Sequence, residues 1–598
     1  MRFFTLLTIF SCFKFAFAQN PPKREFRGAW IATVSNIDFP SSKFLSSEQQ
    51  KAEFVNILNK HQQAGINAVV VQLRTNGDAL YPSELEPWAE WLTGKQGQAP
   101  SPFYDPLALM IEECRKRGLE FHAWLNPYRA VSNINTSQIA DNHIAKKRPD
   151  LLLAYGNLRI LDPGNPESRE WVTKVVMDIV RRYDVDGIHF DDYFYPYPVS
   201  GQVLNDDATF SKFNRGFTNR ADWRRENVDL LIKMVSDSIK AAKPYVKFGI
   251  SPFGIWQNKS ASQPLGSETR GLESYNDIFA NSIKWSQQGW VDYMAPQLYW
   301  YIGYSVADYD KLTKWWASNA NNRHLYIGQA IYRVNADVNW NSGEIPKQIR
   351  LNRNTLGVNG SIFYNTTFLN QNPLGVRDSV INNYFKFPAL PPTMPWKKST
   401  MPNPPTGLIA TLSSKEIQLK WNKAQSGINE IDKIKRYVVY RFANDEKVDL
   451  SNAKAIRHIT NSDENSFTDT EINAALKYTY VVTALDRLHN ESTPSNEASV
   501  QVITEIEEET EIAETELFQN FPNPFNNKTY ITYFLSKGSW VKLRIFDILG
   551  VEKQLLVDEW QSVGLQSIEF NNKILPRGVY IYSIETSDIM LTKRMVIE

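Results

Sequence analysis

From residue 26 to about residue 387, short apolar runs alternate with amphipathic stretches. The runs have the length and composition of buried strands and cover residues 26–34, 67–73, 119–125, 187–191, 247–251, 291–295, 324–329 and 360–364. Helical periodicity appears between them near residues 48–64, 105–117, 168–183, 222–242, 276–288, 308–318, 343–356 and 374–384. Eight strand–helix repeats predict a (β/α)₈ TIM barrel, in the α/β class; a doubly wound open sheet is the alternative.

Polar and aromatic residues follow every predicted strand. The chemistry of such barrels lies at the carboxyl ends of the strands, so these residues mark the expected site. If these residues only capped the helices that follow, we would expect more Ser and Thr among them and fewer Trp and Tyr. The residues are Asn36, Asp38, Arg74, Asn76, Asp78, Asn126, Tyr128, Arg129, Asp191, Asp192, Tyr193, Phe253, Trp256, Gln297, Tyr299, Trp300, Gln329, Tyr332, Arg333, Tyr364 and Asn365.

The fourth predicted strand ends in two adjacent carboxylates, Asp191 and Asp192. Carboxylates supply the proton or the nucleophile for glycoside cleavage, and flat aromatic rings stack on sugars. A lone Asp at this place would be a helix cap. The pair is followed by four aromatic residues and two prolines over residues 193–198, which favours a catalytic site with Asp191 as its first candidate.

Other strand-end residues are expected to contact the substrate. Arg74 and Arg129 are expected either to hold a ligand carboxylate or to fix Asp191 through a bidentate ion pair. Large aromatic residues flanked by polar residues and proline are expected to form sugar-stacking platforms. The expected substrate-binding residues are Arg74, Asp78, Asn126, Tyr128, Arg129, Tyr193, Trp256, Gln297, Tyr299, Trp300 and Gln329.

The second catalytic carboxyl group stays open at this point. A retaining mechanism places it roughly 5–5.5 Å from the first, and an inverting mechanism roughly 6.5–9.5 Å. Asp192, Asp78, Glu273 and Asp277 are the candidates. If the sugar carries an N-acetyl group, its own carbonyl oxygen can be the nucleophile, so a substrate-assisted mechanism is open as well. Adjacent carboxylates raise one pKa, which suits a general acid.

The histidines do not indicate a metal. Only seven are present, and no two have the His-x-x-x-His spacing that a metal-dependent glycan deacetylase needs beside its acid pair. His122 and His189 lie on predicted buried strands and are expected to be hydrogen-bonded core residues. We therefore expect no metal site and no cofactor, and a deacetylase is the weakest of the enzymatic alternatives.

The segments after the barrel are different in composition. Residues 388–405 are rich in proline and predict a stiff spacer. Residues 406–503 alternate apolar and polar positions and resemble a fibronectin type III module, with Trp421 on an early strand and Tyr478-Thr479-Tyr480-Val481 on a later one. An acidic linker over 504–516 then leads into an all-β tail over 517–598.

The N-terminus has the pattern of a signal peptide. A charged start, an apolar stretch and Ala16-Phe17-Ala18 predict export with cleavage after residue 18, which leaves residues 19–387 as the barrel domain. The mature chain then holds one cysteine, Cys114, and no internal disulfide. A net charge of +1 gives no indication of nucleic acid, and no later segment has the roughly 20 apolar residues of a membrane span.

Two regions resemble known families. The tail, from Phe521-Pro522-Asn523-Pro524 through Leu575-Pro576-Arg577-Gly578 to the C-terminus, resembles the C-terminal sorting domain of type IX (Por) secretion substrates. The barrel is similar to glycosyl-hydrolase-like family ten, on blocks that include His122-Ala123-Trp124-Leu125-Asn126-Pro127-Tyr128-Arg129 and Asp186-Gly187-Ile188-His189-Phe190-Asp191-Asp192. These resemblances imply passage through type IX secretion machinery and a glycoside hydrolase acting on a polysaccharide, with peptidoglycan glycan strands as the expected substrate.

The expected function is therefore a secreted or surface-exposed glycoside hydrolase. A non-catalytic, surface glycan-binding protein on a decayed barrel is the alternative, because the spacer and the β-module suit both. Intact acids at the fourth strand favour the enzyme.

Overall fold

The computed structural model describes residues 20–413, 415–444, 446–460, 464–473, 476–502 and 514–598. Two compact units divide the chain, Met1–Ile503 and Thr504–Glu598. The boundary falls at the start of the predicted acidic linker. The predicted signal peptide over residues 1–18 lies outside the described residues, as does most of that linker.

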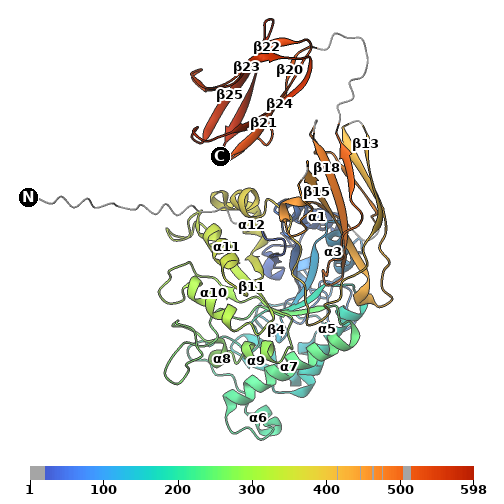
Figure 1. Cartoon of the computed structure of the whole chain (residues 1–598). Helices are drawn as coiled ribbons and strands as arrows, with labels where there is room; N and C mark the ends of the chain where they lie inside the picture. The colour runs from blue at the N-terminus through green and yellow to red at the C-terminus, as the bar shows by residue number, and fades with distance from the viewer. Residues whose placement is uncertain (1–19, 414, 445, 461–463, 474–475, 503–513) are drawn as a thin grey trace, which may run out of the picture. The chain divides into compact units, whose positions relative to one another are not determined.

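A closed parallel barrel forms the centre of the first unit (Figure 1). Its strands in chain order are β1 (Phe26–Ile31), β2 (Ala68–Arg74), β3 (Glu120–Leu125), β7 (Gly187–Phe190), β8 (Lys247–Ile250), β9 (Tyr293–Met294) with β10 (Gln297–Leu298), β11 (His324–Ala330) and β12 (Gly360–Tyr364). Strand β12 pairs with β1, and both β9 and β10 pair with β11, so the circle closes. The predicted (β/α)₈ barrel is confirmed, and the open-sheet alternative is wrong.

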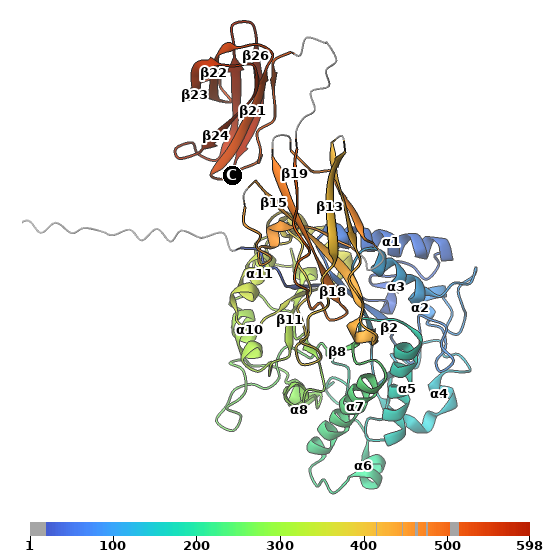
Figure 2. The same ribbon diagram turned by 45° about the vertical axis from the view of Figure 1, so that its right-hand side comes forward.

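Helices follow the strands and surround the barrel, as Figures 1 and 2 show for α1, α3, α5 and α7. Side-chain caps begin several of them: Asp105 accepts from Ala108 N before α3, and Asn165 accepts from Glu167 N before α5. The helices are α1 (Ser47–Gln63), α2 (Glu90–Thr93), α3 (Pro106–Lys116), α4 (Ile144–Lys147), α5 (Pro166–Arg182), α6 (Asp207–Phe213), α7 (Arg220–Ala242), α8 (Ser274–Asp277), α9 (Ser282–Gln287), α10 (Tyr309–Ser318), α11 (Glu344–Asn354), α12 (Thr366–Gln371) and α13 (Val376–Ser379). The helix expected over 276–288 is two shorter helices, α8 and α9.

The loops of the first unit contain further short strands and helical turns. After β3, a small antiparallel sheet forms in the order β4 (Arg129–Val131), β6 (Leu158–Leu161) and β5 (Leu152–Tyr155), which the sequence pattern did not predict. Single turns of tighter or wider helix complete this unit: η1 (Val34–Asn36), η2 (Pro149–Leu151), η3 (Ile331–Arg333), η4 (Pro373–Gly375), η5 (Val380–Tyr384), η6 (Glu430–Asp432) and η7 (Ala453–Ala455).

A β-sandwich ends the first unit. One sheet has the order β13 (Thr406–Ser413), β14 (Glu416–Asn422) and β17 (Ser466–Asp469); the other has β16 (Ile456–Ile459), β15 (Ile434–Ala443), β18 (Lys477–Asp486) and β19 (Ala498–Gln501). Alternation explains strand β14, because Ile417, Leu419 and Trp421 are buried while the residues between them are exposed. The all-β sandwich expected from the alternating pattern is thus present, and its likeness to fibronectin type III stays a prediction.

The second unit is also a two-sheet β-domain, as the sequence predicted. Its sheets are β20 (Glu516–Leu517), β21 (Lys528–Leu535) and β24 (Gly564–Asn571), and β23 (Glu552–Gln561), β22 (Ser539–Asp547), β25 (Gly578–Glu585) and β26 (Met590–Ile597). It has its own apolar core, which includes Ile531, Leu543 and Tyr582.

The proline-rich run is not a free spacer. Leu390 N donates to Lys23 O and Leu390 O accepts from Glu25 N, both at 2.9 Å, so this run pairs with the segment that leads into β1. Trp396 Nε1 donates to Asp292 Oδ1 at 3.0 Å. Leu390 and Met394 are fully buried. The sandwich is therefore held against the barrel instead of standing away from it.

A chain of polar side chains fills part of the barrel interior. The hydroxyl of Tyr293 lies 2.8 Å from His122 Nδ1 and 3.0 Å from His189 Nδ1. His122 Nε2 lies 3.1 Å from Glu120 Oε2, and Glu120 also pairs with Lys247. His122 and His189 are thus hydrogen-bonded core residues, as expected.

The sandwich completes this buried chain. His489, in the loop after β18, is 2% exposed and its Nε2 donates to Glu120 Oε1. Burial lowers the pKa of His489, so the neutral ring is the donor. The carboxylate of Glu120 therefore depends on a residue of the sandwich for one of its hydrogen bonds.

Replacing His489→Ala is expected to destabilise the first unit by about 2 kcal/mol, because a buried carboxylate loses a hydrogen bond and gains no water. Urea unfolding followed by tryptophan fluorescence measures this. His458→Ala is the matched control, since His458 belongs to the same sandwich and stacks on Phe467 of strand β17. Equal, small losses in both variants would contradict the coupling between sandwich and barrel.

Candidate active site

The two acids at the end of β7 are almost completely buried. Asp191 and Asp192 are each 3% exposed. Trp124 Nε1 donates to Asp191 Oδ2 at 3.1 Å, and Asn126 Nδ2 donates to the same oxygen. The other oxygen, Oδ1, accepts from Tyr193 N at 3.4 Å. Asp191 is thus anchored chiefly through Oδ2, by Trp124 of β3 and by Asn126 just after this strand.

A relay of side-chain amides ties this anchor to the neighbouring strands. Gln72 Oε1 accepts from the backbone N–H groups of Thr33 and Val34, both at 3.0 Å. Gln72 Nε2 donates to Asn126 Oδ1 at 2.6 Å, which fixes the Asn126 amide so that its nitrogen faces Asp191. The ends of β1, β2 and β3 therefore position the carboxylate on β7. Gln72 was not among the predicted site residues. A polar residue inside the apolar run of β2 was the signal that could have indicated it.

Asp192 is held by different groups. The hydroxyl of Tyr197 donates to Asp192 Oδ2, and the side chain of Gln297 also interacts with this carboxylate. Gln297 Nε2 donates to Ser251 O at 3.0 Å, which links β10 to the end of β8. Tyr197 was not among the predicted residues, although it belongs to the aromatic run that drew attention to the pair.

Burial raises the pKa of both acids. Burial, together with the negative charge of Asp192, raises the pKa of Asp191 to about 7. Burial also raises the pKa of Asp192, against the hydrogen bonds from Tyr197 and Gln297. The nearby guanidinium of Arg129 lowers both values. A carboxyl group with a pKa raised in this way can hold a proton at higher pH than an ordinary aspartate does.

Arg129 lies at this site without an ion-pair partner among the described residues. Its Nε donates to Thr75 O at 2.9 Å, and its guanidinium carbon lies 4.8 Å from the centre of the Tyr193 ring. Of the two roles expected for Arg129, bidentate pairing with Asp191 is not observed. Its positive charge acts on both acids through space.

Tyrosine rings surround the acids on the sides of β10, β11 and β12. Tyr193 is the most open, with 41% of its surface exposed. Tyr299 stacks on Tyr364 with ring centres 5.8 Å apart and meets Tyr332 edge-on. Trp300 is partly exposed and packs edge-on against Phe253. Tyr193, Tyr299 and Trp300 thus lie at the mouth, and their part as a sugar-binding rim stays a prediction.

A cavity of about 420 Å³ lies against the segment that directly follows the pair in the chain. Tyr193, Tyr197 and Val199 line it from the segment after β7, and Tyr155 lines it from β5 in the small sheet. Arg129 contributes the charged part of the wall. The unpredicted sheet after β3 therefore forms one side of this cavity.

Several predicted substrate contacts are wrong. Arg74 is fully buried, and its Nε and Nη2 both donate to Glu86 at 2.7 Å, so it neither reaches a ligand nor pairs with Asp191. Trp256 is a core residue, 7% exposed, stacked on Trp315 and edge-on to Tyr275. Arg74 of β2 is neutralised by Glu86 of the following loop, and Trp256 is covered by other aromatic side chains.

Two further predicted contacts have no surface to offer a sugar. Tyr128 and Gln329 are fully buried, and Gln329 Nε2 donates to Gln348 at 3.1 Å. Asn126 is equally buried, but it acts on the site through Asp191.

The other candidates for the second carboxyl group accept hydrogen bonds from backbone N–H groups of their own loops. Asp78 Oδ1 accepts from Thr75 N and Asn76 N. Glu273 Oε1 accepts from Asn258 N at 2.8 Å, and Asp277 accepts from Glu273 N. Asp192 alone of the four is adjacent to Asp191 in the chain and coupled to it in charge.

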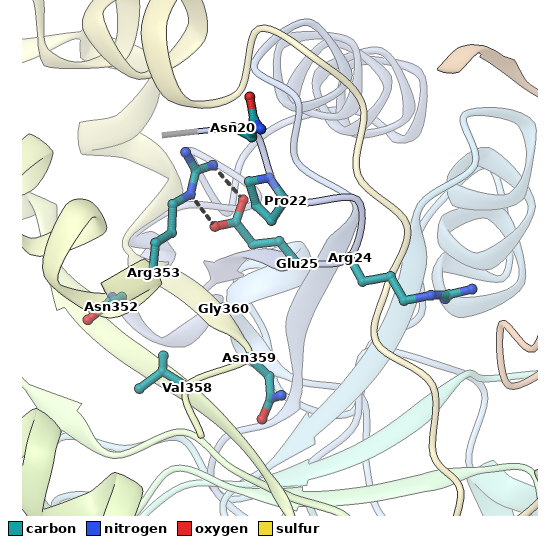
Figure 3. Close-up of a pocket in the computed structure, with 9 residues that line it drawn as sticks. All are labelled: Asn20, Pro22, Arg24, Glu25, Asn352, Arg353, Val358, Asn359 and Gly360. Carbon is teal, nitrogen blue, oxygen red and sulfur yellow. Dashed lines mark hydrogen bonds and ion pairs between the residues drawn. The ribbon is translucent and has the colours of Figure 1, made fainter. Parts of the chain in front are cut away.

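A second, smaller hollow lies at the opposite end of the barrel (Figure 3). Arg24 and Glu25 line it just before β1, and Asn359 just before β12, so it is at the amino ends of the strands. Glu25 is already paired with Arg353 through two contacts of 2.7 Å. This ion pair stabilises the base of the barrel. The acids at the mouth are therefore the candidate site, since chemistry in such barrels lies at the carboxyl ends of the strands.

The fold and the buried acid pair at a tyrosine-lined mouth are those of a carbohydrate-active (β/α)₈ barrel. The chain belongs to the family described as Glycosyl hydrolase-like 10, whose profile matches residues 25–343. A second profile, a secretion system C-terminal sorting domain, matches residues 519–598. This second match confirms the sorting-domain prediction for the tail.

Curated relatives carry hydrolase names. Glycosyl hydrolase YngK of Bacillus subtilis (strain 168) is 44% identical over 486 residues, which cover 80% of this chain and 94% of that protein. Glycosyl hydrolase DigH of Escherichia coli (strain K12) is 41% identical over 371 residues, 58% of this chain and 84% of that protein. Among solved structures, the PgaB glycoside hydrolase domain of Bordetella bronchiseptica is 12% identical with a TM-score of 0.38, and covers 60% of this chain and 99% of that domain. That last likeness is too low to bear on activity.

Asp191 is expected to make folding stability fall as pH rises. Its folded pKa of about 7 exceeds the ordinary value of 3.8, so the folded protein keeps a proton that the unfolded chain releases. The stabilisation is complete below about pH 4 and is lost as the pH rises through about 7. Asp191→Asn should therefore gain about 3 kcal/mol over the wild type near pH 8 and nothing near pH 4.

Urea unfolding at these two pH values checks this prediction. Asp237→Asn is the control, because Asp237 is half-exposed in a surface pair with Lys233 and should shift stability little at either pH. A pH-independent effect of Asp191→Asn would show that the carboxylate is not held in its protonated form.

Proposed function

We propose that the protein is a secreted glycoside hydrolase that cleaves a polysaccharide, with the glycan strands of peptidoglycan as its foremost substrate. The observation that carries the proposal is the buried and anchored pair Asp191–Asp192 at the carboxyl end of strand β7. The hydrolase names of YngK and DigH support the reaction class. The sequence resemblance of the barrel supports the choice of glycan.

The chemistry needs a proton for the departing sugar oxygen and a negative charge to stabilise the cationic sugar. A carboxyl group whose pKa lies near 7 gives up its proton readily at neutral pH. Its ionised neighbour supplies the negative charge. The Gln72–Asn126 relay keeps the acid from turning away, since Asn126 is itself held by Gln72. Arg129 balances the charge of the pair once the proton has left.

Export is part of the proposal. The sorting domain over residues 519–598 supports passage through type IX secretion machinery to the cell surface or beyond. In the described part of the chain, every helix is too short or too polar to cross a membrane. We propose that the N-terminal segment is a signal peptide, and that a polysaccharide outside the cytoplasm is the substrate.

The purified protein, with its sandwich retained, should release reducing ends from peptidoglycan glycan strands stripped of their peptides. Asp191→Asn should lower this rate by about 10³-fold while glycan binding persists, because the change removes the proton donor and keeps the shape. Release is measured by a reducing-end assay, and binding by a pull-down on the insoluble glycan.

Glu273→Gln is the matched control, an acid-to-amide change at a carboxylate that serves Asn258. It should leave the rate within about threefold of the wild type. If the protein releases no reducing ends from this or any plant or algal glycan but binds one of them, it is a glycan-binding protein instead.

A further inference from the structure

The exposed aromatic side chains of the first unit all lie at the carboxyl end of the barrel. In the described part of this unit they are Phe44, which is 82% exposed, Phe103, which is 65% exposed, and Tyr193 at the candidate site. Each lies in a loop that follows a barrel strand and precedes the next helix, so each is on the side of the acids. A single exposed apolar residue needs no explanation, but both phenylalanines have an aromatic neighbour.

Phe44 and Phe103 each lie beside a half-buried tryptophan. The Phe103 ring meets the Trp88 ring edge-on, with ring centres 6.4 Å apart. Lys43 links the other two rings, because its Nζ lies 5.8 Å from the centre of the Phe44 ring and 6.0 Å from that of Trp91. Trp88 and Trp91 are separated by only two residues, so the two pairs are neighbours. We call these four aromatic residues the aromatic platform.

Hydrogen bonds fix the loops that carry the aromatic platform. Gln50 of α1 donates to Leu45 O at 2.9 Å and to Leu92 O at 2.8 Å, which joins the loop before α1 to helix α2. Ser47 Oγ donates to Pro102 O at 2.6 Å, which joins α1 to the loop before α3. Helices α1, α2 and α3 lie together on one side of the barrel (Figure 2). A surface fixed in this way loses little conformational freedom when a ligand binds.

The aromatic platform is connected to the candidate active site through the loop after β1. Asn36 Nδ2 in this loop donates to Trp91 O at 2.8 Å. The backbone N–H groups of Thr33 and Val34, just before it, donate to Gln72, which begins the relay that anchors the first acid. A polymer bound at the acids extends beyond them in both directions. The aromatic platform is therefore within the part of the mouth that such a polymer can reach.

We propose that the aromatic platform is a second sugar-binding site, which holds a more distant part of the polysaccharide strand that is bound at the acids. This inference rests on the proposed function, which supplies a polymeric sugar as the ligand. Sugar rings stack on Phe44 and Phe103, and the ammonium group of Lys43 donates hydrogen bonds to their hydroxyl or carboxylate groups. A strand held here raises the effective concentration of its bonds at the acids. A short oligosaccharide does not gain in this way.

The test uses the full chain with both exposed phenylalanines replaced. The variant Phe44→Leu/Phe103→Leu keeps apolar side chains but removes the flat rings, whereas Phe44→Tyr/Phe103→Tyr keeps the rings. Leu356→Ala is the control for loss of an exposed apolar side chain, since Leu356 lies before β12 at the opposite end of the barrel. All these positions are exposed, so the free energy of unfolding should change little, which urea unfolding checks.

Binding is measured by pull-down on insoluble, peptide-free peptidoglycan strands, and cleavage by a reducing-end assay on these strands and on tetrasaccharides prepared from them. We expect the leucine variant to bind the strands about tenfold more weakly and, below saturation, to cleave them about tenfold more slowly. Its rate on tetrasaccharides should stay within about twofold of the wild type. The tyrosine variant and Leu356→Ala should match the wild type in every assay.

Other results would overturn the inference and leave the hydrolase proposal intact. These are unchanged strand binding by the leucine variant, equal losses in the leucine and tyrosine variants, or a loss on tetrasaccharides as large as the loss on strands. If the wild type cleaves no glycan, the hydrolase proposal fails, and the binding measurements alone decide the inference: weaker binding of the leucine variant supports it, and no binding by the wild type overturns it.

Discussion

Everything at the mouth of this barrel depends on how polar side chains are satisfied inside it. Barrels of this kind usually fill their interior with branched apolar side chains. Here Tyr293 bridges His122 and His189, and the chain continues to Glu120. Each buried polar group would be costly if left unpaired, so the strands have little freedom to slide. His189 precedes Asp191 by two residues, and this constraint therefore fixes where the acids emerge.

The same principle extends from the base to the mouth. At the base, His489 of the sandwich completes the hydrogen bonds of Glu120, which makes the sandwich part of the barrel's stability. At the mouth, the backbone at the end of β1 holds Gln72, Gln72 holds the amide of Asn126, and Asn126 holds the carboxylate of Asp191. Hydrogen bonds inside the barrel thus both stabilise its base and position the acids at its mouth. Burial between these strands, together with the charge of Asp192, raises the pKa of Asp191 to about 7.

Local patterns were enough to predict the barrel and the place of the acid pair. Apolar runs and caps depend on neighbouring residues, and Asp191–Asp192 ends a run that is visible in the sequence. Contacts between distant segments were not predictable: Arg74 was expected at a ligand, but a loop residue, Glu86, neutralises it. Trp256 was expected to be open, but Trp315 covers it. His489 acts more than three hundred residues from its partner Glu120. Gln72 shows the reverse case, a local signal whose role appears only when Asn126 lies beside it.

A crystal structure of the Asp191→Asn variant with an uncleaved oligomer of N-acetylglucosamine tests the central claim most directly. The account predicts a glycosidic oxygen within about 3 Å of the side chain at position 191, with sugar rings against Tyr193. An oligomer bound with its glycosidic oxygens away from both acids would contradict it.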